Sequence, residues 1–262
     1  MAVGIDQFAN TDTLLGRWDP RFKLLSLGLL IFCIALVQTI PIAMMAFVLA
    51  MVLLMIAQVN LHTLHHALIG LSLFLLPFLL ILPLTYPGEH SWHLFSLPFS
   101  WAGFRLAVLI VLKALAIVCC SYALFGSLRF DVAMTALHHL KCPTMLVQIF
   151  VFTYRYIFVF LNEMNSMRRA MGARGFVPKT DLYTLKVIGN FIATLLVKSF
   201  ERTDKVYKAM LSKGYSGEFH TLTTFKSCQK DYVKAGIIIW VAVMIIVIDV
   251  LAVFPDAQQG WY

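Results

Sequence analysis

Five apolar runs, each close to the length that crosses a lipid bilayer, dominate this sequence. They extend over residues 23–40, 41–59, 67–84, 105–125 and 235–253. A transmembrane helix needs roughly 20 consecutive apolar residues. The chain is 60% hydrophobic and only 13% charged, whereas soluble domains average about 45–50% apolar and about 25% charged residues. These features exclude a soluble globular protein and predict an all-α, polytopic membrane protein with about five transmembrane helices.

Basic residues are concentrated on one predicted side of the membrane. Of the 21 Lys and Arg residues, 16 lie within residues 129–234 and three within residues 17–23, whereas the 85–103 loop contains none. Short loops rich in Lys and Arg remain cytoplasmic. We therefore expect a multi-pass protein of the bacterial plasma (inner) membrane, with the N-terminus and the 129–234 segment inside and the 85–103 loop outside.

This topology divides the chain into three regions. We expect a membrane domain of four spans at residues 1–126, a cytoplasmic helical region at residues 127–234, and a fifth transmembrane helix with an outside tail at residues 235–262. The N-terminus lacks the features of a cleaved signal peptide, so the first span is expected to remain as an anchor. The five cysteines contain no C-x-x-C pair, and we interpret them as packing residues rather than a zinc site or disulfide framework.

One further segment, residues 145–161, is apolar enough to form a sixth span. It carries Arg155 near its middle, and an arginine costs about 2.5–3.5 kcal/mol at the centre of a transmembrane helix. A crossing here would also move Arg168, Arg169 and Arg174 to the outside. We therefore interpret the segment as a helix at the cytoplasmic face, with a sixth span as the alternative.

Two long helices are predicted in the cytoplasmic region. Apolar residues recur every three or four positions over residues 182–210, which is typical of one face of an amphipathic helix. Asp181 suits the start of this helix and Gly214 suits its end. A preceding helix is predicted over residues 144–174, followed by Gly175.

The ends of these two helices repeat one another. RAMGARGF at residues 169–176 aligns with KAMLSKGY at residues 208–215, with three identities and four conservative changes in eight positions. A helix often ends at Gly with Lys or Arg in its last turn, because the cation complements the helix dipole. This explanation accounts for either end alone, but it does not require a matched aromatic residue after both.

The alternative is that each helix end is a plug for a partner protein. A cation beside a glycine that permits close approach, followed by an aromatic residue that can fill a pocket, suits an acidic groove. Two matching plugs indicate a partner with two matching grooves, which a symmetric or pseudo-symmetric dimer offers. We therefore interpret the repeat as two copies of one docking element.

Three stretches are together typical of one family of membrane proteins. Residues 173–175 read Ala-Arg-Gly, the DPRFK stretch at residues 19–23 fits a D-x-R-x-K pattern, and residues 152–176 form a long aromatic and cationic helix. On these stretches the chain resembles the transmembrane T component of energy-coupling factor transporters, in particular the cobalt/nickel branch called CbiQ. The resemblance extends over about residues 17–220. At the second tip, residues 212–214 read Ser-Lys-Gly, which keeps the charge but loses the planar guanidinium fork.

The resemblance implies a non-catalytic coupling subunit of an ATP-driven importer for cobalt or nickel, linked to cobalamin biosynthesis. The implied partners are a P-loop ATPase dimer, which binds ATP and Mg²⁺, and a substrate-binding membrane component that carries the metal. This chain then needs neither cofactor nor metal, and residues 172–180 (GARGFVPKT) lack the glycine that precedes the lysine of a phosphate-binding loop. The implied ATPase-coupling residues are Ala173, Arg174, Gly175, Ser212, Lys213 and Gly214.

Other polar residues in apolar surroundings are weaker candidates. His62, His65 and His66 have a spacing that suits a metal site on a helix, but we place them in a short turn between spans two and three and favour an interfacial role. Lys113 and Asp249 are intramembrane charges, which are functional candidates by default. Asp249 lies near the outer end of its span, where we expect water to solvate the carboxylate at little cost in free energy. Lys113 is therefore the better candidate for contact with a partner. Snorkelling or an internal pair is its alternative.

Three other functions remain open. The chain could be the T component of a transporter for a vitamin such as biotin. A membrane-embedded metal-dependent enzyme that uses the histidines near residue 62 would retain metal in the isolated chain. A secondary transporter would need an inverted repeat and discontinuous helices at the midplane, whereas the repeat found here is short and cytoplasmic.

Overall fold

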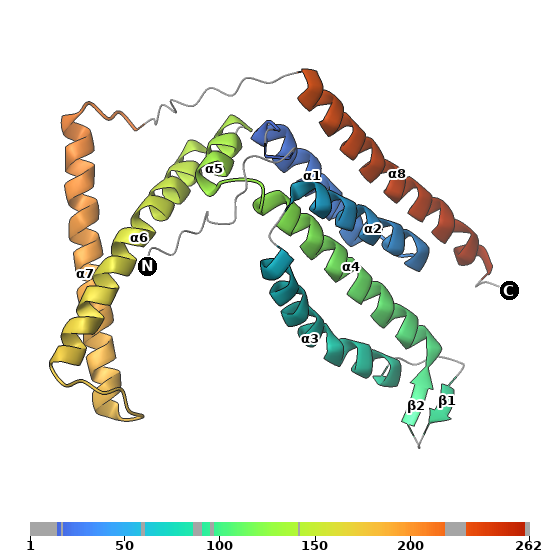
Figure 1. Ribbon diagram of the computed structural model, residues 1–262, viewed down its shortest axis with the longest axis horizontal. Helices are drawn as coiled ribbons and strands as arrows, with labels where there is room; N and C mark the ends of the chain where they lie inside the picture. Colours follow the sequence, from blue (N-terminus) through green and yellow to red (C-terminus); the bar gives the residue numbers. More distant parts are fainter. Residues whose placement is uncertain are drawn as a thin grey trace. The chain divides into compact units, whose positions relative to one another are not determined.

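The helices of the protein divide into two compact units, as the computed structural model in Figure 1 shows. The structure describes residues 15–16, 18–58, 61–85, 91–94, 97–140, 142–217 and 229–259. The membrane unit comprises residues 5–133 and 225–262. The helical hairpin unit comprises residues 1–4 and 134–224.

The membrane unit contains the five predicted spans as helices. They are α1 (Pro20–Leu36), α2 (Ile40–Ala57), α3 (Leu61–Thr85), α4 (Trp101–Phe125) and α8 (Gln229–Gln259). A short antiparallel hairpin of β1 (Ser91–Leu94) and β2 (Leu97–Ser100) connects α3 to α4, and the short helix α5 (Phe130–His139) spans the boundary between the two units. The predicted fold class, an all-α polytopic membrane protein, is confirmed.

The number of helices that could cross a membrane is slightly larger than predicted. In the described ranges, six helices are long and apolar enough by length and composition: α2, α3, α4, α6 (Thr144–Ala173), α7 (Leu182–Ser212) and α8. Helix α1 is shorter, with 17 residues. The additional candidates are therefore the two long helices that the sequence predicts at the cytoplasmic face.

Small residues form the centre of the membrane unit. Helix α4 packs against α1, α2 and α3, and α8 packs against α1 and α2. Helices can approach closely in a membrane where small side chains face one another. The fully buried small residues include Ala43, Ala46, Ala50 and Ala57 on α2 and Ala107, Ala116, Cys119, Cys120 and Ala123 on α4. The cysteines of the spans are buried and free, as predicted for packing residues.

The DPRFK stretch anchors one end of α1. The carboxylate of Asp19 accepts a hydrogen bond from the backbone N–H of Arg21 (3.1 Å) and caps the helix. Lys23 is fully buried, and its Nζ donates to the carbonyl oxygens of Leu15 and Ser127, each at 2.9 Å. This lysine therefore ties the start of α1 to the chain segment that follows α4.

Asp249 anchors the other end of α1. Its Oδ2 accepts a hydrogen bond from the backbone N–H of Gln38 (2.9 Å), and its Oδ1 accepts from the N–H and the hydroxyl of Thr39 (3.0 and 2.7 Å). Asp249 is only 6% exposed. The expectation that water solvates this carboxylate is therefore wrong, because the α1–α2 turn supplies its donors instead.

In the helical hairpin unit, α6 and α7 run antiparallel. Met171 shares a cavity with Val187, Glu163 pairs with Lys198, and Gln148 bonds to Gly217. Residue numbers fall along α6 as they rise along α7 in this series. The two helices therefore form a long hairpin closed by the segment at residues 174–181 (Figure 1).

Candidate functional site

The first predicted tip is a helix end closed by a Schellman motif. Helix α6 ends at Ala173, and Gly175 follows with a φ of 76°. The backbone N–H of Phe176 donates to the carbonyl of Met171 (3.1 Å), and that of Gly175 donates to the carbonyl of Gly172 (3.0 Å). This bond pattern and the left-handed glycine define the motif.

The second tip has the same geometry. Helix α7 ends at Ser212, and Gly214 follows with a φ of 83°. The N–H of Tyr215 donates to the carbonyl of Met210 (3.1 Å), and that of Gly214 donates to the carbonyl of Leu211 (3.0 Å). The sequence repeat therefore encodes a structural repeat of two identical helix ends, as predicted.

The motif also explains the residues that the two tips share. A Schellman motif brings together the side chains three positions inside the helix and two positions beyond its cap. Met171 and Phe176 occupy these positions at the first tip and line one cavity. Met210 and Tyr215 occupy them at the second. The matched aromatic residue, which the sequence argument assigned to a partner's pocket, thus has a local role in closing the helix.

The side chains of the two cations take no part in the hydrogen bonds that close the helix ends. Arg174 and Lys213 occupy the C-cap positions, and both side chains are exposed. Within the described ranges, neither side chain has an ion pair or a hydrogen-bond partner. Each tip therefore presents one unpaired positive charge at the end of a rigid helix.

Ser212 replaces Ala173 without adding a free polar group to the tip. Its hydroxyl donates to the carbonyl of Lys208 one turn earlier, at 3.0 Å. The serine hydroxyl therefore bonds within its own helix. The residue that precedes the cation is small at both tips, Ala173 before Arg174 and Ser212 before Lys213.

The two tips lie at opposite ends of the hairpin. Gln148, near the start of α6, contacts the segment just beyond the second tip, whereas the first tip is the far end of the same helix. The 26 residues from Gln148 to Arg174 correspond to about 40 Å at 1.5 Å per residue. A partner that holds both cations must therefore offer two well-separated sites.

Gln148 fixes the second tip to the start of α6. Its Oε1 accepts a hydrogen bond from the hydroxyl of Tyr215 (3.0 Å), and its Nε2 donates to the carbonyl of Gly217 (3.1 Å). Phe176, the counterpart of Tyr215, has no hydroxyl for such a bond. The sequence analysis missed this contact because the two residues are 67 positions apart.

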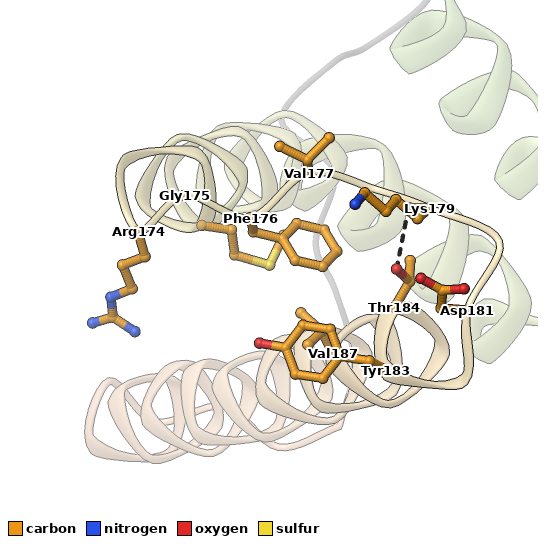
Figure 2. A pocket seen from close by; sticks show the side chains of 10 residues that line it. Arg174, Gly175, Phe176, Val177, Lys179, Asp181, Tyr183, Thr184 and Val187 are labelled. Atoms are coloured by element: carbon orange, nitrogen blue, oxygen red, sulfur yellow. Dashed lines mark hydrogen bonds between the residues drawn. The ribbon is translucent and has the colours of Figure 1, made fainter.

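A cavity of about 590 Å³ lies beside the first tip (Figure 2). The N–H of Lys179 donates to the Oγ1 of Thr184 (3.1 Å), which holds the connecting segment against the first turn of α7. The rings of Phe176 and Tyr183 face the cavity, whereas the guanidinium of Arg174 extends away from it (Figure 2). Arg174 thus borders the cavity while remaining exposed.

Charged contacts join the two helices near their middle. Lys198 on α7 forms an ion pair with Glu163 on α6. The guanidinium carbon of Arg202 lies 5.9 Å from the ring centroid of Tyr156, which is within the range of a cation–π contact. These contacts brace a hairpin in which few residues of α6 or α7 are buried.

The apolar stripe predicted on α7 is exposed. Leu182, Leu185, Leu196 and Phe200 are 86%, 67%, 63% and 75% exposed. Exposed apolar surface of this extent is typical of a protein or membrane contact. The hairpin thus carries an apolar face along α7 in addition to its two charged tips.

The remaining candidates are Lys113 and the histidines of α3; His65 and His66 are exposed. The Nζ of Lys113 donates a hydrogen bond to the carbonyl of Ala35 at 3.0 Å, so Lys113 has a partner within the chain. Contact of Lys113 with a partner protein stays a prediction. His65 and His66 lie within α3 rather than in a turn, because the helix begins at Leu61. The described residues contain no group of three or more potential metal ligands.

One protein family matches most of the chain, including the two tips and the DPRFK stretch. Residues 11–224 match the family model named CbiQ, described as a cobalt transport protein. The chain belongs to the CbiQ family. The description of the family as a cobalt transport protein agrees with a multi-pass membrane protein, because six helices of the described residues could cross a membrane by length and composition. Helix α8 lies beyond the matched residues.

Three relatives of this CbiQ protein are archaeal. Two uncharacterised proteins of Methanocaldococcus jannaschii are 25% and 30% identical over 64% and 60% of this chain, which corresponds to 56% and 57% of their own lengths. A protein of Methanocorpusculum labreanum named as a fused cobalt transport protein CbiMQ is 24% identical over 47% of this chain and 20% of its own length. The chain thus spans little more than half of the length of the first two relatives.

Proposed function

We propose that this chain is the transmembrane coupling subunit of an energy-coupling factor importer for cobalt or nickel ions. The observation that carries the proposal is the pair of exposed, unpaired cations on two identical helix ends. Ordinary helix capping accounts for the glycine, the methionine and the aromatic residue of each tip, and the helix dipole favours a cation there. Neither effect requires that the cation be exposed and unpaired at both tips. We assign Arg174 and Lys213 to acidic grooves on a partner.

The partner is proposed to be a dimer of P-loop ATPases that binds ATP and Mg²⁺. A dimer with two-fold symmetry offers two equal grooves, and the separation of about 40 Å requires that they lie on different subunits. Closure of the dimer on ATP would change the distance between the grooves. The braced α6–α7 hairpin would then transmit this movement as a lever.

The membrane side of the mechanism uses the apolar face of α7. We propose that a substrate-binding membrane component, which carries the metal, contacts this face, because its leucines and phenylalanine have no cover within the described chain. The hairpin would then be in contact with the ATPases at its ends and with the substrate-binding component along its side. This arrangement couples ATP hydrolysis in one partner to release of the metal from the other.

The test is co-purification with charge reversal at both tips. The chain is tagged in its native host, extracted in mild detergent, and compared with an Arg174→Glu/Lys213→Glu variant by quantitative mass spectrometry. A hydrogen bond to a charged group contributes about 1.5–3 kcal/mol, so loss of two should weaken ATPase binding by at least about a hundredfold. We expect the ATPases to be absent from the variant.

The matched control is Arg168→Glu/Lys205→Glu, which makes the same change in net charge on the same two helices. Both residues are exposed and lie within three turns of the tips. We expect this variant to retain the ATPases. Retention of the ATPases by the tip variant, or equal loss from both variants, would contradict the assignment. A comparison of the uptake of labelled cobalt, labelled nickel and labelled biotin then identifies the transported substrate.

A further inference from the structure

A groove opens at the end of the membrane unit that carries the α1–α2 turn. The cavity measures about 740 Å³ and is bordered by the α1–α2 turn, α2, α4 and α8. Ile42 and Leu109 form its buried floor, with exposed fractions of 6% and 8%. Met45, Leu106 and Ile248 form its exposed walls. The groove is therefore an open, largely apolar hollow between three helices of the membrane unit.

Such a groove requires an occupant in a bilayer. An unfilled void lacks partner atoms on one side, so the side chains that line it lose dispersion contacts. Water gains little at the floor and walls because their side chains are apolar, and the polar lining is limited to Gln38, Thr39 and Arg105. The N–H groups of Gln38 and Thr39 are already bonded to Asp249. A hydrocarbon chain matches these walls.

One cation stands at the border of this apolar surface. Arg105 is exposed and lies one turn after Trp101, the first residue of α4. Among the side chains that the structure describes, none forms an ion pair or a hydrogen bond with its guanidinium. The carboxylate of Asp249, which lies at this end of α8, is bonded to the α1–α2 turn. A planar guanidinium at a bilayer interface is suited to bidentate binding of a phosphate.

We propose that this groove binds one glycerophospholipid, with its phosphodiester at Arg105 and an acyl chain along the floor of Ile42 and Leu109. The combination of one cation with apolar walls selects an amphiphile with an anionic head. A bound lipid would join α8, which lies outside the family match, to α2 and α4. This site is independent of the coupling tips, so its test does not depend on them.

The test measures lipid binding to the purified full-length chain by native mass spectrometry. The protein is stripped of lipid in detergent and titrated with phosphatidylglycerol, or with diacylglycerol of the same acyl chains, which lacks the phosphate. The variants are Arg105→Gln, Arg105→Lys, and Ile248→Trp, which fills the groove but leaves the cation. Arg129→Gln is the control at the opposite end of α4, where the guanidinium bonds Asp131.

The expected result is one phosphatidylglycerol that binds at least about tenfold more weakly to the Arg105→Gln variant. Ile248→Trp should also weaken it, and Arg105→Lys should weaken it less than Arg105→Gln does, because lysine keeps the charge but loses the planar fork. Arg129→Gln should retain it. Thermal melting in detergent without lipid verifies that each variant is folded. If the Arg105→Gln variant does not fold, the Ile248→Trp variant tests the site instead. Equal binding to Arg105→Gln, equal binding of diacylglycerol, or capture of a protein by a photo-crosslinker at Met45 in native membranes would overturn the proposal.

Discussion

Replacement of glycine by alanine should have opposite effects at the tips and in the middle of α7. At Gly175 and Gly214 the backbone is left-handed, with φ of 76° and 83°, and an added Cβ meets no atom within 4 Å. The cost is therefore conformational, about 1–2 kcal/mol for an L-residue. At Gly189, which is helical and equally open, alanine should stabilise the helix by about 0.8–1 kcal/mol.

Hydrogen exchange measured by mass spectrometry in lipid nanodiscs can follow both effects. Since 1.4 kcal/mol corresponds to a factor of ten, amide exchange in the last turn of the altered helix should accelerate about 5–30-fold in Gly175→Ala and Gly214→Ala. Exchange around residue 189 should slow about fourfold to fivefold in Gly189→Ala. If all three variants changed protection in the same direction, the assignment of left-handed helix ends would be refuted.

Three further outcomes are expected from the contacts in the two units. Asp249→Asn should accelerate exchange in the α1–α2 turn at least about tenfold, because the amide cannot accept all three hydrogen bonds, whereas the exposed Asp131→Asn should change it by less than about twofold. Tyr215→Phe should loosen the second tip by about 0.5–1.5 kcal/mol through loss of its bond to Gln148, measured by exchange at residues 213–217. Lys198→Ala should lower the melting temperature by only a few degrees, because its ion pair is partly exposed.

Much of the structure of the two candidate tips could be predicted from the sequence because its determinants are local. A Schellman motif is set within about six consecutive residues, so the repeat at residues 169–176 and 208–215 specifies both helix ends directly. The periodicity of α7 and the glycines that follow both helices gave the correct bounds of the hairpin. The shared aromatic residues also have a local explanation, because the cap favours an apolar residue at that position, and their contact with a partner stays a prediction.

The features that the sequence did not reveal depend on contacts between distant residues. Asp249 receives its donors from a turn 210 positions earlier, and Gln148 meets a residue 67 positions later. Periodicity reports which face of a helix is apolar, but not which backbone groups the fold leaves free to bond a carboxylate. The sequence predicts a turn at His65 and His66 between two apolar runs, whereas α3 begins before them at Leu61.

The most direct test of the coupling account is ATP-driven uptake of labelled cobalt into vesicles that contain the full assembly purified from the native host. The account predicts ATP-dependent uptake with the native chain and with Arg168→Glu/Lys205→Glu, and its loss with Arg174→Glu/Lys213→Glu although the chain remains in the membrane. Uptake at the native rate by the tip variant would contradict the claim that the two cations connect ATP hydrolysis to transport.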